Sequence, residues 1–337
     1  MDNEPVSVLF SYWYFQKQTP FDKITAALRE ATRRGRTVRV LVDSGAFSAD
    51  TQGHRISGDE YADWIRDRVV PEWGPWVVGC LNLDVLRNPE ASWKNWRRLA
   101  DRGVDTIPVT HMGDGTDVID RYVAAGSDYV ALGAMVGKSI TRKARWAAHI
   151  HKHVLSNHPE VRLHGLGLAG QELVERLPWY SVDSSSFGSG YRFARAVVYD
   201  RQSRKSVTVQ LSGAPPERSV LEMIRRDYGL GWDDIRDPGA HNRRVLVQFA
   251  ARSLLAWQYD LRRFRPVTAP PSRSATGPHV SFVVTTPDER RDIMTGGPHV
   301  SFVDNVPDDY LWTTTSGPHI THADNQPVDT ANYLEAL

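Results

Sequence analysis

The sequence has a single cysteine, Cys80, among its 337 residues. One cysteine excludes an internal disulfide framework and any zinc site built from several cysteines. No apolar run approaches the length of about 18 residues that a membrane-spanning helix needs. Residues 1–10 lack a basic segment followed by an apolar one, so no signal peptide is expected. These absences predict a cytoplasmic protein without a membrane partner.

The chain also has little net charge. Its 41 Lys and Arg residues against 40 Asp and Glu residues give a formal charge of +1. That balance argues against a strongly cationic nucleic-acid-binding protein, although it leaves local basic patches open. Hydrophobic residues make up 41%, enough for a sizeable core, so bulk disorder is not expected. The length allows two domains, or one barrel of about 250 residues with an appendage.

Short apolar runs recur at even intervals, with helix-like segments between them. Most runs are continuously apolar, which is typical of parallel strands covered on both faces. They span 6–10, 38–42, 76–83, 106–110, 129–133, 161–167 and 180–184. The helical segments span 21–35, 57–70, 88–103, 117–126, 141–157 and 170–177, and Ser57 with Glu60 predicts a capping box. Repeated strand–helix units predict an α/β fold with a parallel sheet.

An eight-stranded (β/α)8 barrel of the TIM type is the architecture that these units favour. Residues 197–211 predict a β-hairpin, which carries or replaces the eighth strand. A doubly wound open sheet is the alternative, but no GxGxxG motif follows the first strand. We therefore expect a (β/α) barrel domain at 1–215 and a helical extension of the barrel at 216–266.

The remaining segment, 267–337, contains a Pro-rich linker and a repeat. GPHVSFV begins at Gly277 and again at Gly297, and GPHITHA begins at Gly317, so the period is 20 residues. Each unit predicts a short strand and a turn, and three copies either stack into a small module or form a flexible tail. We expect the repeated histidines to be turn residues, which could bind metal only if the copies stack; they are His279, His299 and His319.

Functional residues of a (β/α) barrel gather at the C-terminal ends of its strands. That rule brings three carboxylates to one mouth, namely Asp43, Asp84 and Asp183. One carboxylate can attack an anomeric carbon, a second can move a proton, and a third can accept hydrogen bonds from a base. The alternatives are three N-caps of the following helices and a site for Mg²⁺.

The order of the strand-end motifs resembles that of the tRNA-guanine (queuine) transglycosylase superfamily, and especially its phage-type DNA-guanine branch. VDSGAF at 42–47 resembles the family's DSGGFQ, LGAMVG at 132–137 resembles GGLAVGE, and HGLG at 164–167 resembles MGVG. Asp84 takes the place of a base-recognising Asp, His111 that of a base-reading Gln, and Asp183 that of the nucleophile. The resemblance covers about Val6 to Ser186, with a weaker extension to about residue 265.

Three departures from the family pattern favour the DNA-modifying branch. The CxCxxC…H zinc site is absent, Lys138 replaces the Glu that ends GGLAVGE, and SSSFGSGYR follows Asp183 in place of a PTR-type segment. The resemblance then implies a pentosyltransferase that exchanges guanine in DNA for a free 7-deazaguanine, such as 7-cyano-7-deazaguanine. The alternatives are guanine exchange in tRNA, a non-catalytic nucleic-acid-binding paralogue, and an unrelated Mg²⁺-dependent hydrolase.

The resemblance also implies roles for individual residues. Asp183 is the expected nucleophile and Asp43 the expected acid/base. The residues expected to bind the base are Ser44, Gly45, Asp84, His111, Gly133, Ala134, Gly165 and Gly167. The residues expected to contact phosphates are Lys138, Arg142 and Lys143. No cofactor and no metal are implied, and His149 and His153, four residues apart, are expected on a helix surface.

The expected partners are DNA, or tRNA, and the free base, and a homodimer is left open. If the chain is phage-encoded, the expected compartment is the host cytoplasm. Further basic residues, among them Arg33 and Arg34, are expected to belong to solvated helix faces rather than to the site.

Overall fold

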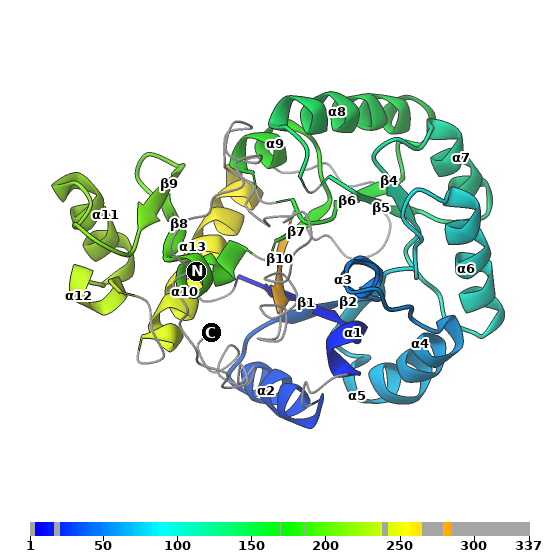
Figure 1. Cartoon of the computed structure of the whole chain (residues 1–337), viewed down its shortest axis with the longest axis horizontal. Helices are drawn as coiled ribbons and strands as arrows, with labels where there is room; N and C mark the ends of the chain where they lie inside the picture. Colours follow the sequence, from blue (N-terminus) through cyan, green and yellow to red (C-terminus); the bar gives the residue numbers. More distant parts are fainter. Residues whose placement is uncertain are drawn as a thin grey trace.

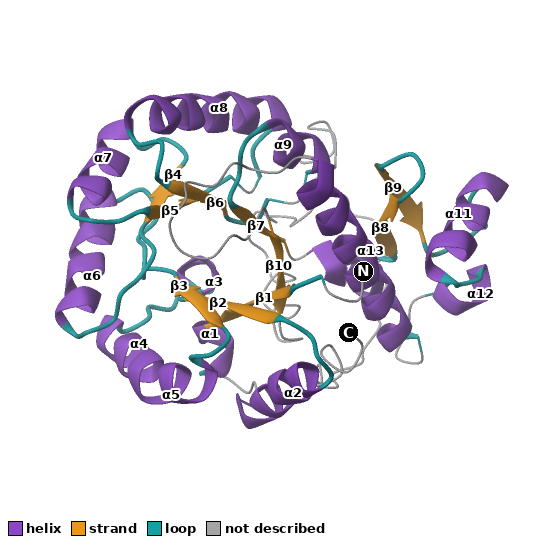
Figure 2. Ribbon diagram, turned by 180° about the vertical axis from the view of Figure 1, so that it is seen from behind, coloured by secondary structure: helices purple, strands orange, loops and turns teal. Residues whose placement is uncertain are grey.

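A computed structural model describes residues 4–16, 21–135, 137–168, 170–184, 186–237, 242–264 and 279–284. Within these ranges an eight-stranded sheet lies at the centre and helices surround it (Figures 1 and 2). Every pairing between neighbouring strands of this sheet is parallel. The fold is therefore mixed α/β with a parallel sheet, as the strand–helix repeat predicts.

The strand order of the sheet is β3-β2-β1-β10-β7-β6-β5-β4. In chain order these strands are β1 (Val6–Ser11), β2 (Val38–Asp43), β3 (Val77–Cys80), β4 (Val109–His111), β5 (Tyr129–Gly133), β6 (Arg162–Gly165), β7 (Ser181–Ser184) and β10 (His279–Val284). The first and last strands of the order also meet. Leu81 after β3 bridges Ile107 before β4, and the Ile107 N–H donates to the Cys80 carbonyl at 2.7 Å.

The eighth position in the sheet is filled by β10, which belongs to the first of the repeats. Its Ser281 lies in register with Ser7 of β1 on one side and with Asp183 of β7 on the other. The predicted hairpin forms β8 (Arg195–Asp200) and β9 (Lys205–Gln210), a separate antiparallel pair, and does not supply the eighth strand. A strand with two parallel neighbours favours β-branched and aromatic residues, and HVSFVV contains four of them: Val280, Phe282, Val283 and Val284. The second and third repeats lie outside the described residues.

Helices cover the outside of the sheet and build a lobe beside it (Figure 1). Those that follow the strands of the sheet are α1 (Tyr12–Phe15), α2 (Phe21–Arg33), α3 (Ala46–Thr51), α4 (Gly58–Trp64), the π-helix η1 (Ile65–Val69), α5 (Val70–Trp73), α6 (Pro89–Asp101), α7 (Thr116–Ala124), α8 (Ile140–Asn157), α9 (Gln171–Arg176), the 3-10 helix η2 (Ser186–Gly188) and α10 (Ser189–Phe193). The later helices are α11 (Arg218–Tyr228), α12 (Trp232–Ile235) and α13 (Arg243–Phe264). Among the described helices, none has the length and apolar character needed to cross a bilayer.

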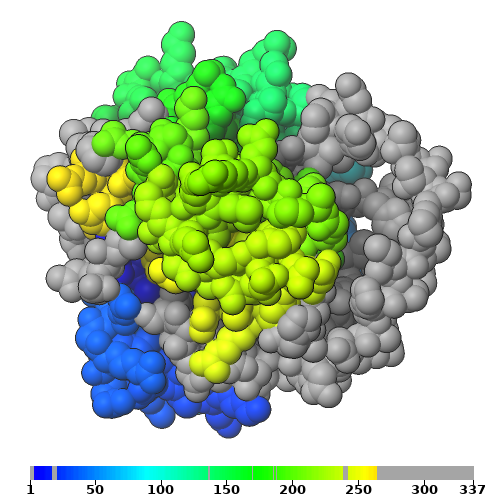
Figure 3. Space-filling model, turned by 90° about the vertical axis from the view of Figure 1, so that its left-hand side faces the viewer, coloured from blue at the N-terminus to red at the C-terminus, as the bar shows by residue number. Residues whose placement is uncertain are grey.

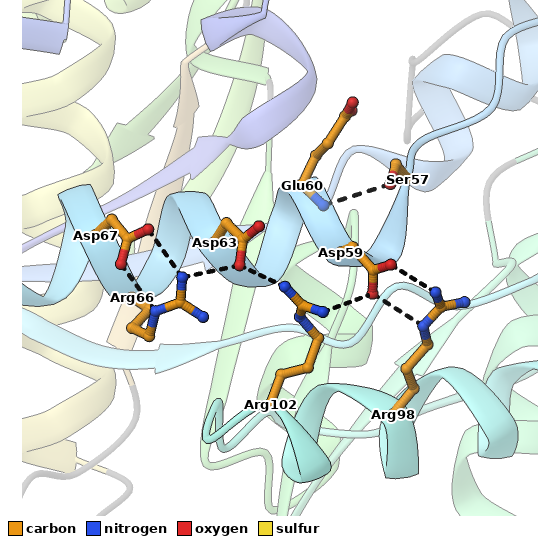
Figure 4. Close-up of polar contacts among 8 residues, drawn as sticks. All are labelled: Ser57, Asp59, Glu60, Asp63, Arg66, Asp67, Arg98 and Arg102. Atoms are coloured by element: carbon orange, nitrogen blue, oxygen red, sulfur yellow. Dashed lines mark hydrogen bonds and ion pairs between the residues drawn. The ribbon is translucent and has the colours of Figure 1, made fainter.

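The helix predicted at 57–70 begins as expected and ends later. The Ser57 hydroxyl accepts from the Glu60 N–H at 3.4 Å, which is half of the predicted capping box. The chain then widens into η1 and continues through α5, and Pro71, whose ring nitrogen has no N–H to donate, stands two residues after the end of η1. Ion pairs tie this helix to α6: Arg98 contacts Asp59 at 2.6 Å and Arg102 contacts Asp63 at 2.6 Å (Figure 4).

Alternate residues of the strands enter different hydrophobic clusters. In β1 and β2, Leu9 and Leu41 join a cluster made up of residues from the strands and the segments next to them, whereas Val8 and Val40 pack with helices. Tyr129 and Ala131 of β5 belong to the same cluster as Leu9 and Leu41. Because successive side chains of a strand point to opposite faces, one face of the sheet packs on itself and the other on the helices. This burial on both faces explains the continuously apolar runs.

The lobe beside the sheet has a core of its own. Side chains of β8, β9, α11 and α12 form a separate cluster, and these elements face the viewer in green to yellow in Figure 3. Helix α13 joins the lobe to the rest, because Phe249 packs in the lobe while Val247 and Trp257 pack against the elements around the sheet. The hairpin and the predicted helical extension therefore form one packed unit.

Candidate active site

Asp43 lies within electrostatic reach of the two other predicted carboxylates, Asp84 and Asp183. Asp43 ends β2 two residues after Leu41, so both side chains share the inward face of the sheet. Burial, and after it the charges of Asp84 and Asp183, raise the pKa of Asp43 to about 7. The Gly45 N–H, which donates to Asp43 Oδ2 at 3.0 Å, lowers the pKa of Asp43 and so offsets part of this rise. The Asp43 carboxyl can therefore hold or release a proton near neutral pH, as an acid/base requires.

Replacing Asp43 by asparagine is expected to change the pH dependence of stability. The folded protein keeps the Asp43 proton up to about pH 7, whereas the unfolded chain loses it near about pH 4. The folded state binds more protons between these values, so the free energy of unfolding of the wild type falls as pH rises through this window. The full shift corresponds to at most about 4 kcal/mol. Urea denaturation at about pH 5 and about pH 8 should show Asp43→Asn gaining on the wild type at the higher pH, and an equal difference at both would contradict the assignment.

Asp183 is buried and held by groups from neighbouring strands. Its Oδ1 accepts from the Gly167 N–H at 3.0 Å and lies 3.1 Å from His164 Nε2. His164 is fully buried, and its Nδ1 lies 2.5 Å from the Ser181 hydroxyl, which in turn meets the Tyr129 hydroxyl at 2.5 Å. This chain of contacts fixes the His164 ring and, through it, one oxygen of Asp183. A carboxylate held in this way is oriented for attack by its other oxygen.

Asp84 is paired with His111. Asp84 Oδ2 lies 2.7 Å from His111 Nε2. Although burial opposes the shift, this hydrogen bond raises the pKa of His111 and favours its charged form. The second ring nitrogen, Nδ1, makes no hydrogen bond among the described residues but lies 3.9 Å from Asp114 Oδ2, so the charged ring stands between two carboxylates. The Asp84 side chain is more exposed than that of His111, at 14% against 4%, so a ligand would meet this pair through Asp84.

Packing and backbone contacts surround two of the residues expected to bind the base. The Ser44 side chain is fully buried and accepts from the Ala46 N–H at 3.3 Å. At Gly165 an added Cβ would lie 2.9 Å from Leu168 and 3.2 Å from Trp179, so this position faces packed side chains. Ala134, directly after β5, has a φ of 59°, a left-handed conformation that an alanine rarely adopts. Such strain collects at functional sites, which agrees with the base-contacting role expected for Ala134.

Gly45 is required by packing as well as by its backbone. It has a φ of 77°, and an added Cβ would lie 2.4 Å from both the Ser11 hydroxyl and the Trp13 Cβ. Gly45→Ala is therefore expected to cost about 2–5 kcal/mol, from left-handed strain and steric overlap together. Gly35→Ala is the control, because Gly35 has a φ of 82° with nothing within 4 Å, and it should cost only about 1–2 kcal/mol. Equal costs in urea denaturation would show that the contacts around Gly45 are not tight.

The basic residues expected to contact phosphates differ in exposure. Lys138 and Arg142 lie exposed between β5 and the first turn of α8. Lys143, by contrast, is only 5% exposed. Arg33 and Arg34 both bind Glu30 at 2.7 Å, as expected for a solvated helix face.

Metal-ligating side chains gather away from the three aspartates. In the part of the chain that the structure describes, one set of three histidine or acidic residues has its ligand atoms within 4.8 Å of one another, namely Asp120, His153 and His158. His149 lies exposed on α8, as expected, whereas His153, also expected on the helix surface, is 20% exposed and contacts Asp120. By sequence, the chain matches no protein-family model and none of the curated proteins.

Proposed function

We propose that this chain is a base-exchange transglycosylase, which replaces guanine in DNA by a free 7-deazaguanine such as 7-cyano-7-deazaguanine. The observation that carries the proposal is a pair of carboxyls with different environments in one site. Asp43 has a pKa of about 7, and Asp183 is buried with Oδ1 held by Gly167 and His164. Covalent glycosyl transfer needs such a pair, one carboxyl to move protons and one to attack the anomeric carbon.

The proposal includes a closed (β/α)8 barrel of the TIM type. Two observations support it: the backbone contact between Cys80 and Ile107, which joins the first and last strands of the order, and the cluster made by the inward residues of the strands. In such a barrel the C-terminal strand ends form one mouth, where Asp43, Asp84 and Asp183 would lie together.

In the proposed reaction Asp183 attacks C1′ of a guanosine nucleotide. The bond between Asp183 and C1′ forms as the bond between C1′ and N9 breaks, and the leaving guanine takes the proton of Asp43. The incoming base then returns a proton from its N9 to Asp43, and its N9 attacks C1′ and releases the Asp183 carboxylate. Protons and bonds balance over the two halves, and neither half needs an oxidant or a cofactor.

The other residues of the site would bind the two substrates. Asp84 with His111, and the backbone at Gly133 and Ala134, would hold the base. The target nucleotide must leave the helical stack, at a cost of a few kcal/mol. Lys138 and Arg142 are exposed near this end of β5 and would contact phosphates, so binding should weaken as salt rises.

The single cysteine favours DNA over tRNA as the substrate. The tRNA-modifying enzymes that the sequence resembles carry a zinc site with three cysteines. A chain with Cys80 alone cannot form that site. Cys80 is also buried, and burial raises the pKa of its thiol to about 12, so it is a poor metal ligand.

Nucleoside mass spectrometry tests the proposed function. Duplex DNA and tRNA are each incubated with the protein and 7-cyano-7-deazaguanine, then digested to nucleosides. We expect the modified deoxynucleoside in the DNA digest and no modified nucleoside in the tRNA digest. Modified tRNA with unchanged DNA would replace the DNA assignment by the tRNA one. No exchange in either, with protein shown to be folded, would overturn the transglycosylase assignment.

A further inference from the structure

A second cluster of chemically active side chains lies between α7 and α8. Asp120 belongs to α7, His153 to α8, and His158 is the residue that follows α8. Both histidines direct Nε2 at the same Asp120 oxygen, each at 2.7 Å. The two helices lie side by side on the outside of the molecule in Figures 1 and 2. Two imidazole nitrogens therefore converge on one carboxylate oxygen.

The geometry points to a Zn²⁺ site formed by Asp120, His153 and His158. Two imidazole nitrogens and one carboxylate oxygen are ligands that zinc takes in protein sites, with a water molecule in the fourth position. The ligand atoms already lie within 4.8 Å of one another, so small rotations bring them to tetrahedral spacing. His153 and His158 are about one-fifth exposed, at 20% and 22%, which leaves room for that water.

The surroundings hold the ligands in place. The Asn157 amide nitrogen lies 3.3 Å from His153 Nδ1 and also donates to the His153 carbonyl at 2.9 Å. A metal-bound His153 would donate from Nδ1, and the Asn157 side chain offers the acceptor when its amide is turned by 180°. The backbone of His158 is fixed at both ends, because its N–H donates to Val154 at 2.7 Å and its carbonyl accepts from Val161 at 2.9 Å. Zinc binding needs each ring to carry its proton on Nδ1 rather than on Nε2, and the Asn157 amide to turn so that its oxygen faces His153 Nδ1.

The position of the cluster separates it from the three aspartates. Helix α8 begins shortly after the C-terminal end of β5 and ends shortly before β6 begins. The cluster at its far end therefore lies toward the N-terminal strand ends, opposite the three aspartates. A zinc ion there would tie α7 to α8 and would stabilise the folded state by mass action.

Zinc titration of the tag-free full-length protein, in competition with a chromophoric chelator, tests the site. We expect one Zn²⁺ per chain, a melting temperature that rises with zinc, and visible bands of four-coordinate geometry when Co²⁺ is used. His158→Ala and Asp120→Asn should weaken binding by more than the roughly 10- to 100-fold typical of outer partners. His149→Ala is the matched control, since His149 is exposed on the same helix outside the cluster, and should bind as the wild type does. Absence of zinc binding, or equal binding by His158→Ala and the wild type, would overturn the site, and neither result bears on base exchange.

Discussion

Asp183→Asn is expected to lower the rate of base exchange at least about 1,000-fold, because the amide cannot attack C1′ as a nucleophile. Asparagine has nearly the same shape as aspartate, so its side-chain oxygen can still accept from the Gly167 N–H, as Asp183 Oδ1 does at 3.0 Å. The folded structure should therefore persist while the chemistry is lost. Initial rates with saturating DNA and free base measure the effect.

A matched control separates the loss of the nucleophile from a general loss of charge. Asp101→Asn makes the same chemical change at the exposed end of α6, outside the site, and should leave the rate unchanged. Circular dichroism and urea denaturation should show both variants folded. An Asp183→Asn variant that is folded and as active as Asp101→Asn would remove Asp183 from the mechanism.

Removing residues 265–337 is expected to destabilise the protein by at least about 3 kcal/mol or to abolish cooperative folding. The deletion takes away β10, which lies between β1 and β7 in the middle of the strand order. Both neighbours would then expose backbone N–H and C=O groups along a buried edge, where missing hydrogen bonds are costly. Urea denaturation of the two proteins measures the difference.

The repeat supplies a precise control for this truncation. Deleting residues 277–296 removes one period, and HVSFVD from the second repeat then follows the same linker in place of HVSFVV. This variant should fold with a denaturation midpoint near that of the full chain, because five of the six strand residues are identical. If the long truncation unfolds at the same midpoint as the full chain, β10 does not contribute to the sheet.

Most of the fold is predictable from sequence because its signals are local. Burial on both faces makes strands continuously apolar, and seven predicted runs overlap strands of the sheet. The eighth strand is not predictable in this way. The segment HVSFVV sits in a Pro-rich, repetitive tail, and its partners β1 and β7 are distant in sequence. The extension of the helix beyond residue 70 was also missed, since Pro71 usually marks a helix end rather than its continuation.

The site is predictable only in part, because its supporting contacts join different strands. The rule that function collects at C-terminal strand ends is enough to single out Asp43, Asp84 and Asp183. His164, Ser181 and Tyr129 were not predicted as site residues, although His164 and Ser181 interrupt apolar strands and so carry a signal. The cluster of Asp120, His153 and His158 was not predicted either, because it also joins residues from different elements. Sequence spacing places His153 on a helix surface, and only the packing of α7 against α8 brings Asp120 to His153 and His158.

Trapping the covalent intermediate tests whether Asp183 is the nucleophile. A guanine-containing DNA oligonucleotide is mixed with the protein without incoming base, quenched rapidly in acid, digested, and examined by peptide mass spectrometry. We expect a depurinated nucleotide attached to the peptide that contains Asp183, and no adduct in Asp183→Asn. An adduct on any other residue, or release of guanine by the wild type without any adduct, would contradict this assignment.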